Sequence, residues 1–222
     1  MFMKRTLRQS ELQKNIKGEI IAPGRVLERS RNEAAALIFL GECSTVPVPK
    51  VYREFELDGA HCIIMEYIKG DLLADLKESS KPAVIEELQN HIKAMHSISA
   101  SQIGGVSPPG LVCLPYRISR VAQIDENELK PFESDELVFC HNDLSQHNVL
   151  VDPETHVIQA IIDFEYSGFY PSFFESQFYR RVGPSIALNG EDDDTDRLIG
   201  FINSHKVGTL NCCVAWANVT QV

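Results

Sequence analysis

Residues 138–168 read VFCHNDLSQHNVLVDPETHVIQAIIDFEYSG and hold most of the polar groups that suggest a site. These groups lie between short apolar runs, which are typical of strands that frame two loops. One loop runs from His141 to Asn148, and Asp163 comes directly after a later apolar run. Because rigid strands often hold functional loops in place, we expect a site here.

The side chains of this segment suit phosphoryl transfer from a nucleotide. Mg²⁺ prefers hard oxygen ligands, and a further carboxylate must orient the acceptor hydroxyl and take its proton. Asp143 is the predicted base, and Asn148 and Asp163 are the predicted magnesium ligands. The spacing His-x-Asp-x-x-x-x-Asn from His141 is that of a kinase catalytic loop, and DFE at Asp163 replaces its Asp-Phe-Gly. The alternative is a pair of turns, which Asp and Asn also favour.

HNDLSQHNVLVD (141–152) followed by IIDFEYSGFYP (161–171) resembles the aminoglycoside phosphotransferase and choline-kinase-like family, and most of all its fungal members of unassigned substrate. The resemblance extends over about residues 1–200. It implies an α+β, protein-kinase-like fold of two lobes, with a reduced N-terminal lobe and a mainly helical C-terminal lobe. ATP at the hinge and Mg²⁺ are the implied cofactors, and Asp143 is the implied base.

The resemblance also implies a division of the chain. Residues 1–68 are expected to form a partial N-terminal lobe that ends at the hinge. Residues 69–222 are expected to form the C-terminal lobe, with the catalytic loop and the metal-binding strand. No glycine-rich loop precedes Lys4, and residues 205–222 have no clear place in the family pattern. The family pattern therefore looks truncated at both ends, and the role of 205–222 is open.

Three further parts of the implied nucleotide site come from the N-terminal segment. A helix glutamate, Glu33, would pair with a phosphate-binding strand lysine, although an exposed helix glutamate is the alternative. Lys4 is the best candidate for that lysine, against an unstructured basic terminus, with Lys14 and Lys17 as weaker candidates. The hinge would be Glu66-Tyr67-Ile68, through main-chain groups, or else a plain strand end. His141 belongs to the predicted catalytic loop in a structural role.

The remaining chain predicts alternating helices and strands. The expected helices are residues 32–41, with 28–31 as a proposed backward extension, 81–97 and 194–204. The expected strands are residues 54–57, 61–67, 136–140, 148–151 and 157–163. Asp58-Gly59 is a hairpin turn signal. The acidic run 191–196 is expected to precede a helix, where the helix dipole favours negative charge, with binding of a cationic substrate as the alternative.

Composition narrows the function further. The 222 residues carry a net charge of −10, which disfavours nucleic acid as a partner. The six cysteines form no CxxC pair, so a zinc site or a disulfide framework is not expected. Neither a signal peptide nor a membrane span is expected, so we expect a cytoplasmic protein. The oligomeric state is open.

These observations favour an ATP-dependent phosphotransferase that acts on a hydroxyl of a small molecule. The acceptor itself is left open. The alternative is a catalytically inactive, truncated kinase-like binding protein, because the glycine-rich loop is missing. A protein kinase proper ranks last, since no Ala-Pro-Glu motif follows the metal-binding strand.

Overall fold

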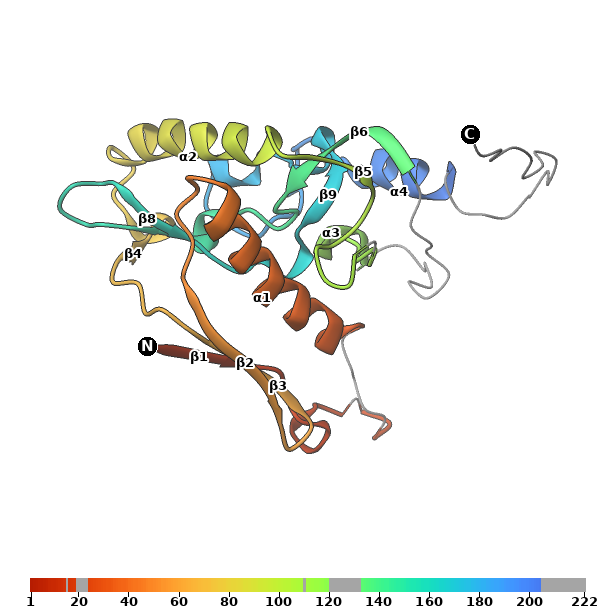
Figure 1. Cartoon of the computed structure of the whole chain (residues 1–222). Coiled ribbons are helices and arrows are strands. Elements are labelled where there is room, and N and C mark those ends of the chain that lie inside the picture. Colours follow the sequence, from red (N-terminus) through yellow and green to blue (C-terminus); the bar gives the residue numbers. More distant parts are fainter. Residues whose placement is uncertain (15, 19–23, 110, 120–132, 205–222) are drawn as a thin grey trace, which may run out of the picture.

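The computed structural model describes residues 1–14, 16–18, 24–109, 111–119 and 133–204 (Figure 1). Its α-helices are α1 (Val26–Cys43), α2 (Lys81–His96), α3 (Tyr116–Ser119) and α4 (Thr195–Ser204). Its strands are β1 (Phe2–Arg5), β2 (Val51–Leu57), β3 (Ala60–Met65), β4 (Asp71–Leu72), β5 (Ser99–Gln102), β6 (Glu133–Cys140), β7 (Val149–Val151), β8 (Ile158–Ile161) and β9 (Gly168–Pro171). This mixture confirms the predicted α+β class.

The first sheet is antiparallel with the order β1-β3-β2. Asp58 and Gly59 both have positive φ (51° and 75°), as a tight hairpin turn requires, and the predicted hairpin is confirmed. The central strand, β3, is almost entirely buried, whereas β2 is largely exposed. Pairing of Lys4 with Ile63 gives the N-terminal strand a fixed register. Lys4 therefore lies in a sheet and not in an unstructured terminus.

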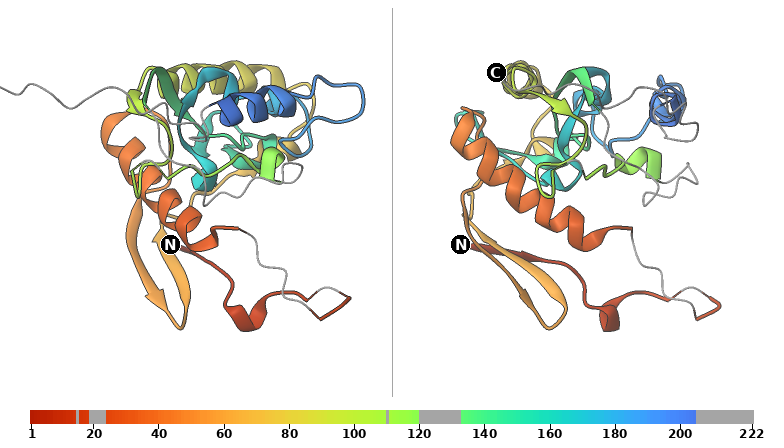
Figure 2. Two further views of the ribbon diagram at one scale, coloured as in Figure 1. Left: turned by 90° about the vertical axis from the view of Figure 1, so that its right-hand side faces the viewer. Right: turned by 45° about the vertical axis from the view of Figure 1, so that its right-hand side comes forward.

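Helix α1 lies between this sheet and the rest of the described chain (Figures 1 and 2). Ala34, Ala36, Leu37 and Leu40 are buried on its inner faces. The helix begins at Val26, so it includes residues 28–31, the proposed backward extension, and starts two residues before them. The first turns also bury three polar side chains, those of Arg29, Ser30 and Asn32. These polar residues interrupt the apolar pattern from which a helix is recognised in the sequence.

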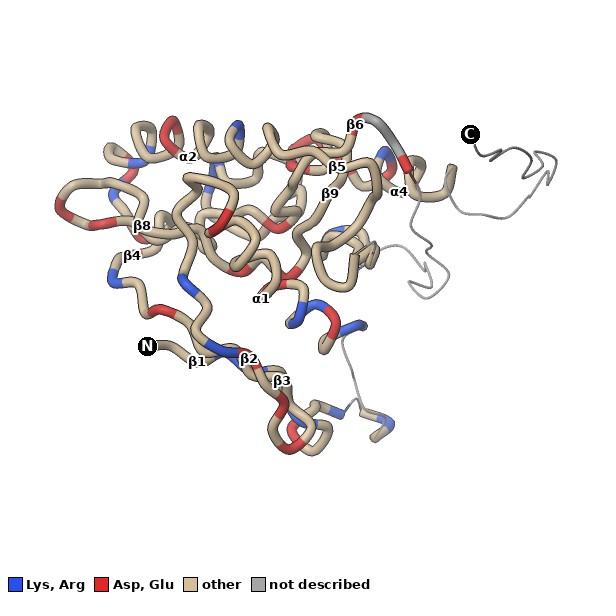
Figure 3. The backbone as a smooth tube through the Cα atoms, viewed as in Figure 1, with Lys and Arg blue, Asp and Glu red and all other residues tan. Residues whose placement is uncertain are grey.

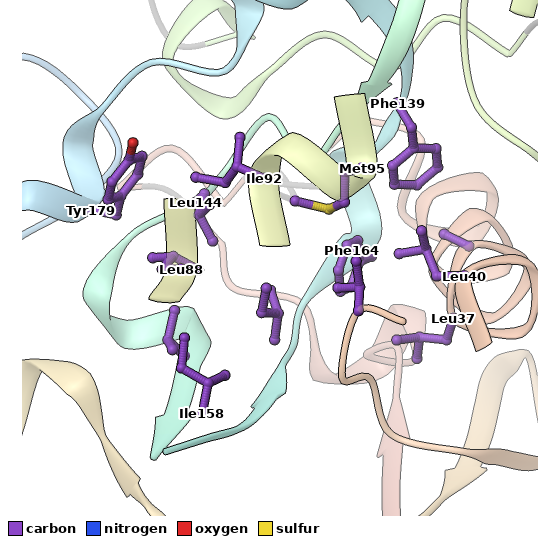
Figure 4. Close-up of a cluster of buried hydrophobic side chains, with 14 of the residues drawn as sticks. Leu37, Leu40, Leu88, Ile92, Met95, Phe139, Leu144, Ile158, Phe164 and Tyr179 are labelled. Atoms are coloured by element: carbon purple, nitrogen blue, oxygen red, sulfur yellow. The ribbon is translucent and has the colours of Figure 1, made fainter. Parts of the chain in front are cut away.

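The remaining strands form two small antiparallel sheets, with the orders β4-β7-β8 and β5-β6-β9. Helix α2 covers them and buries the predicted apolar face of Val84, Leu88, Ile92 and Met95. Figure 4 shows Leu88, Ile92 and Met95 of this face in one cluster with Phe139 and Phe164. The core thus packs directly behind the segment that was expected to carry the site.

Two expectations from the sequence concern the C-terminal residues and membrane-spanning helices. Residues 205–222 lie outside the described residues, so the open question of their role is untouched. Within the described residues, no helix combines the length and the apolar character that a membrane span needs.

Candidate functional site

Lys4, Glu33 and Asp163 come from β1, α1 and the end of β8, and the fold brings their side chains together. The Lys4 ammonium lies 2.7 Å from Glu33 Oε2 and 2.5 Å from Asp163 Oδ1. Glu33 is 2% exposed, whereas the side chains of Lys4 and Asp163 are each 35% exposed, so solvent screens this ion pair in part. The structure therefore brings together three residues that the sequence could suggest only individually as candidates.

The electrostatics of this trio follow from its burial. Desolvation raises the pKa of Glu33 to about 7, although the positive charge of Lys4 opposes the rise. Burial also disfavours the charged form of Lys4, but the two carboxylates outweigh it and raise the pKa of the ammonium group. A cation fixed in this way can bind the negative oxygens of a phosphate group.

A cavity of about 420 Å³ has this trio at one end. The predicted hinge residues, Glu66, Tyr67 and Ile68, line it as well. Apolar side chains contribute much of its remaining wall: Phe2, Leu37, Pro49, Met65, Leu150 and Ile162. An apolar slot with a charged end suits a flat ring attached to a phosphate chain.

Asp143 lies in the loop between β6 and β7, on a second cavity of about 270 Å³ that Asn148 also lines. Burial raises the pKa of Asp143 to about 6, while a hydrogen bond from Ser185 opposes the rise and the charge of Asp163 adds to it. A carboxylate with a pKa close to neutrality is suited to accept a proton.

Asn148 and Asp163 have the donor types that Mg²⁺ prefers. The Asn148 Nδ2 donates to the carbonyl oxygen of Asp143 (2.8 Å), which fixes the amide group. The backbone N–H of Ile162 donates to the carbonyl of Asn148 (3.0 Å), so the residue before Asp163 is bonded to the loop. Asp163 itself adopts a left-handed conformation (φ 68°), which turns the chain sharply after β8. The two side chains offer one carboxylate and one amide oxygen, both hard donors.

His141 is completely buried, and both of its ring nitrogens meet backbone groups. Nδ1 accepts from the N–H of Asp143 (3.2 Å) and Nε2 donates to the carbonyl of Ile162 (2.9 Å). This assignment of the tautomer follows from the hydrogen bonds. Desolvation lowers the pKa of the ring. His141 thus joins the 141–148 loop to the backbone just before Asp163, and its structural role in catalysis stays a prediction.

Three residues that support the loop were missed in the sequence. Glu175 is fully buried and accepts from the N–H groups of His141 and Asn142. Arg117 donates to the carbonyl of Asn142 (3.0 Å) and forms a bidentate ion pair with Asp194 (3.0 Å from both Nε and Nη2). A buried arginine with a buried aspartate 77 positions away leaves no local pattern in a sequence.

The acidic run 191–196 contains this Asp194, and its members have separate roles. Asp193 accepts from the N–H of Thr195 (3.0 Å) at the start of α4, as was predicted for the run. Asp194 instead holds Arg117, and Glu191 pairs with Arg181 (2.6 Å). The helix-start explanation is therefore right for one residue and incomplete for the run.

Comparison with known proteins places the chain in a family. Residues 19–175 match the model of the phosphotransferase enzyme family, and the chain belongs to that family. Among curated proteins, it is 27% identical over 137 residues to an aminoglycoside 3'-phosphotransferase of Streptomyces ribosidificus, covering 53% of this chain and 52% of that protein. It is also 43% identical over 56 residues to a probable choline kinase of Arabidopsis thaliana, covering 22% of this chain and 16% of that protein.

Solved structures that resemble the chain are aminoglycoside phosphotransferases. One from Streptomyces rimosus, in complex with ADP and streptomycin, has a TM-score of 0.49 at 13% identity, over 68% of this chain and 66% of that one. Another, a thermostable mutant with ADP and hygromycin B, has a TM-score of 0.47 at 18% identity, over 64% and 59%. The chain spans about half the length of the Streptomyces ribosidificus relative. The resemblance to the family and the kinase-like fold class are confirmed. The fungal affinity and the truncation stay predictions.

Proposed function

We propose that this chain is an ATP-dependent phosphotransferase that acts on a hydroxyl group of a small molecule. The observation that carries the proposal is the convergence of Lys4, Glu33 and Asp163 at the charged end of the cavity that Glu66, Tyr67 and Ile68 line. In this proposal residues 1–68 are the partial N-terminal lobe and residues 69–222 the C-terminal lobe. Their junction at the hinge is then the wall of the nucleotide site.

Each side chain has a definite task in the proposed reaction. Lys4 binds phosphate oxygens, and Glu33 holds the ammonium group in place. Asn148 and Asp163 would hold Mg²⁺, which neutralises the charge of the phosphates when it is bound. Asp143 accepts the proton of the acceptor hydroxyl in its own cavity. Most of the rate enhancement then comes from positioning and from charge neutralisation.

The cavity at Asp143 favours an acceptor that also carries a positive charge. Tyr116 and Tyr166 present aromatic rings to it, and Glu165 adds a second carboxylate. Aromatic faces and carboxylates both attract ammonium groups. Aminoglycosides and choline, the substrates that the relatives' names indicate, are hydroxyl compounds of this kind.

The surface charge disfavours a nucleic-acid acceptor. Figure 3 shows basic positions interspersed with acidic ones over the described residues. This differs from the basic stripe of a nucleic-acid-binding protein, and the net charge of −10 adds to the repulsion of phosphate backbones. The proposed partners are therefore a nucleotide and a small molecule, and the proposed location is the cytoplasm, where ATP is available.

Calorimetric titration with ATP tests the nucleotide and metal sites, with and without Mg²⁺. We expect wild type to bind ATP more tightly with Mg²⁺, and Asp163→Ala to lose that gain, by about tenfold or more. Asp152→Ala is the matched control, because Asp152 lies on the β7–β8 hairpin, outside both cavities, and its carboxylate accepts from the turn N–H groups of Glu154 and Thr155.

The outcomes separate the proposals. If Asp163→Ala keeps the magnesium dependence, the metal assignment is wrong. If wild type does not bind ATP at all, the nucleotide site is refuted. If it binds ATP and transfers phosphate to no acceptor or water, the inactive binding protein is the better description.

A further inference from the structure

The Asp143 carboxylate accepts a hydrogen bond from a side chain of this same protein. The Ser185 hydroxyl donates to Asp143 Oδ1. Ser185 is 4% exposed and lines the same cavity as Asn148. This inference rests on the proposed function, in which an acceptor hydroxyl must donate to Asp143 while it attacks the phosphate. Ser185 already places a hydroxyl in that position.

The segment around Ser185 is built to present it. The guanidinium of Arg181 donates to the carbonyls on both sides of the serine, at Pro184 (2.8 Å) and at Ile186 (2.6 Å). Arg181 is itself fixed by a bidentate pair with Glu191 (2.6 and 2.7 Å). The planar guanidinium of Arg181 and the planar carboxylate of Glu191 form two hydrogen bonds in fork geometry, which leaves little freedom to the turn that carries Ser185. The position of the Ser185 hydroxyl is therefore set by the protein and not by chance rotation.

We propose that Ser185 is an intramolecular acceptor, and that the chain phosphorylates itself on this residue. The Ser185 oxygen forms a bond to the γ-phosphorus of ATP, and the bond from that phosphorus to the β–γ bridging oxygen breaks. ADP leaves with the bonding electrons, and the hydroxyl proton passes to Asp143. The products are phosphoserine and ADP.

The modification would also change the acceptor cavity. A phosphoserine carries about −1.5 to −2 charges at neutral pH. Asp143 and Glu165 line the same cavity, so like charges would face one another there. Phosphorylation is thus expected to drive the segment 181–191 away from Asp143 and to open the cavity to an external acceptor.

Peptide mass spectrometry of the purified 222-residue chain after incubation with ATP and Mg²⁺ tests this inference. We expect phosphate on Ser185 in wild type. Ser185→Ala should reduce the total phosphate label at least tenfold, whereas Ser185→Thr should carry phosphothreonine at the same position. Ser172→Ala, which removes an exposed serine outside the cavity, should label as wild type does.

Arg181→Gln supplies a second test that leaves both reacting groups in place. It removes the ion pair to Glu191, so we expect the labelling rate to fall several-fold. In the nucleotide-free protein, Ser185→Ala should lower the urea midpoint, and this decrease should shrink when Asp143 is already alanine, which accepts no hydrogen bond. An undiminished loss contradicts the contact between Ser185 and Asp143.

Failure of the inference differs from failure of the proposed function. If ATP binds in a magnesium-dependent way and is turned over, but Ser185 stays unmodified or another residue carries the label, the inference is refuted and the phosphotransferase stands. If ATP does not bind, both are refuted.

Discussion

Replacement of Arg117 by methionine should destabilise the protein more than any surface substitution. The Arg117 side chain is 3% exposed and that of its partner Asp194 is 5% exposed, so the variant leaves a buried carboxylate without its cation. Loss of one partner of a buried pair costs about 3–5 kcal/mol. The carbonyls of Asn142 and Phe174 also lose their donor, which places the expected loss near the upper end of that range, about 5 kcal/mol.

Urea denaturation followed by circular dichroism measures this loss. Arg197→Met is the control, because Arg197 lies exposed over the ring of Phe173 and its removal should cost about 0.5 kcal/mol or less. The double variant Arg117→Met, Asp194→Leu should recover much of the loss, since it leaves no buried charge. A loss below about 1 kcal/mol, or a double variant no more stable than the single one, would refute the reasoning.

Two more predictions concern residues near the loop. Burial raises the pKa of Glu175 from 4.5 to about 7. Between these two pH values the folded state keeps a proton that the unfolded chain releases. The free energy of unfolding therefore falls by up to about 3 kcal/mol as pH rises through this window. Glu175→Gln lacks this ionisation, so its free energy of unfolding relative to wild type should rise between pH 5 and pH 7.5, and a constant difference contradicts the prediction. Gly105→Ala would place a Cβ 2.3 Å from the buried Asn32 Oδ1, and should cost about 2 kcal/mol in thermal unfolding. Gly41→Ala, on α1, would place its Cβ at an ordinary 3.9 Å from Val48 Cγ2 and should instead stabilise by about 0.5 kcal/mol, and equal effects of the two would refute the argument.

The proximity of the candidate site residues was predictable where it follows from short spacing. Asp143 and Asn148 lie five residues apart in one loop, and Asp163 ends the next hairpin, so the strand pattern alone brings them near each other. Lys4 could be placed only once β1 was seen to pair with β3. Four residues are too few for a periodic signal, and the pairing with a strand some 60 positions later is decided by tertiary structure.

The supports of the site were not predictable for a related reason. Arg117, Glu175 and Asp194 are charged residues in buried positions, which composition and periodicity assign to the surface. Their partners are backbone groups of the loop or each other, and no pattern encodes such a pairing. The early turns of α1 were predicted only as an extension over residues 28–31, because buried polar residues interrupt the apolar stripe that identifies a helix.

His141 and two of the missed residues, Glu175 and Arg117, explain how a short loop can hold the Asp143 carboxylate in place. His141 ties the loop to the strand before Asp163, Glu175 accepts from two of its N–H groups, and Arg117 binds its carbonyl at Asn142. All three supports are buried, so water does not compete for these bonds. In the proposed reaction, a base held in this way would meet its substrate without the entropy cost of ordering, and such positioning is the main contribution a protein makes to phosphoryl transfer. Substitutions at these supports should therefore lower kcat, even though the side chains touch no substrate.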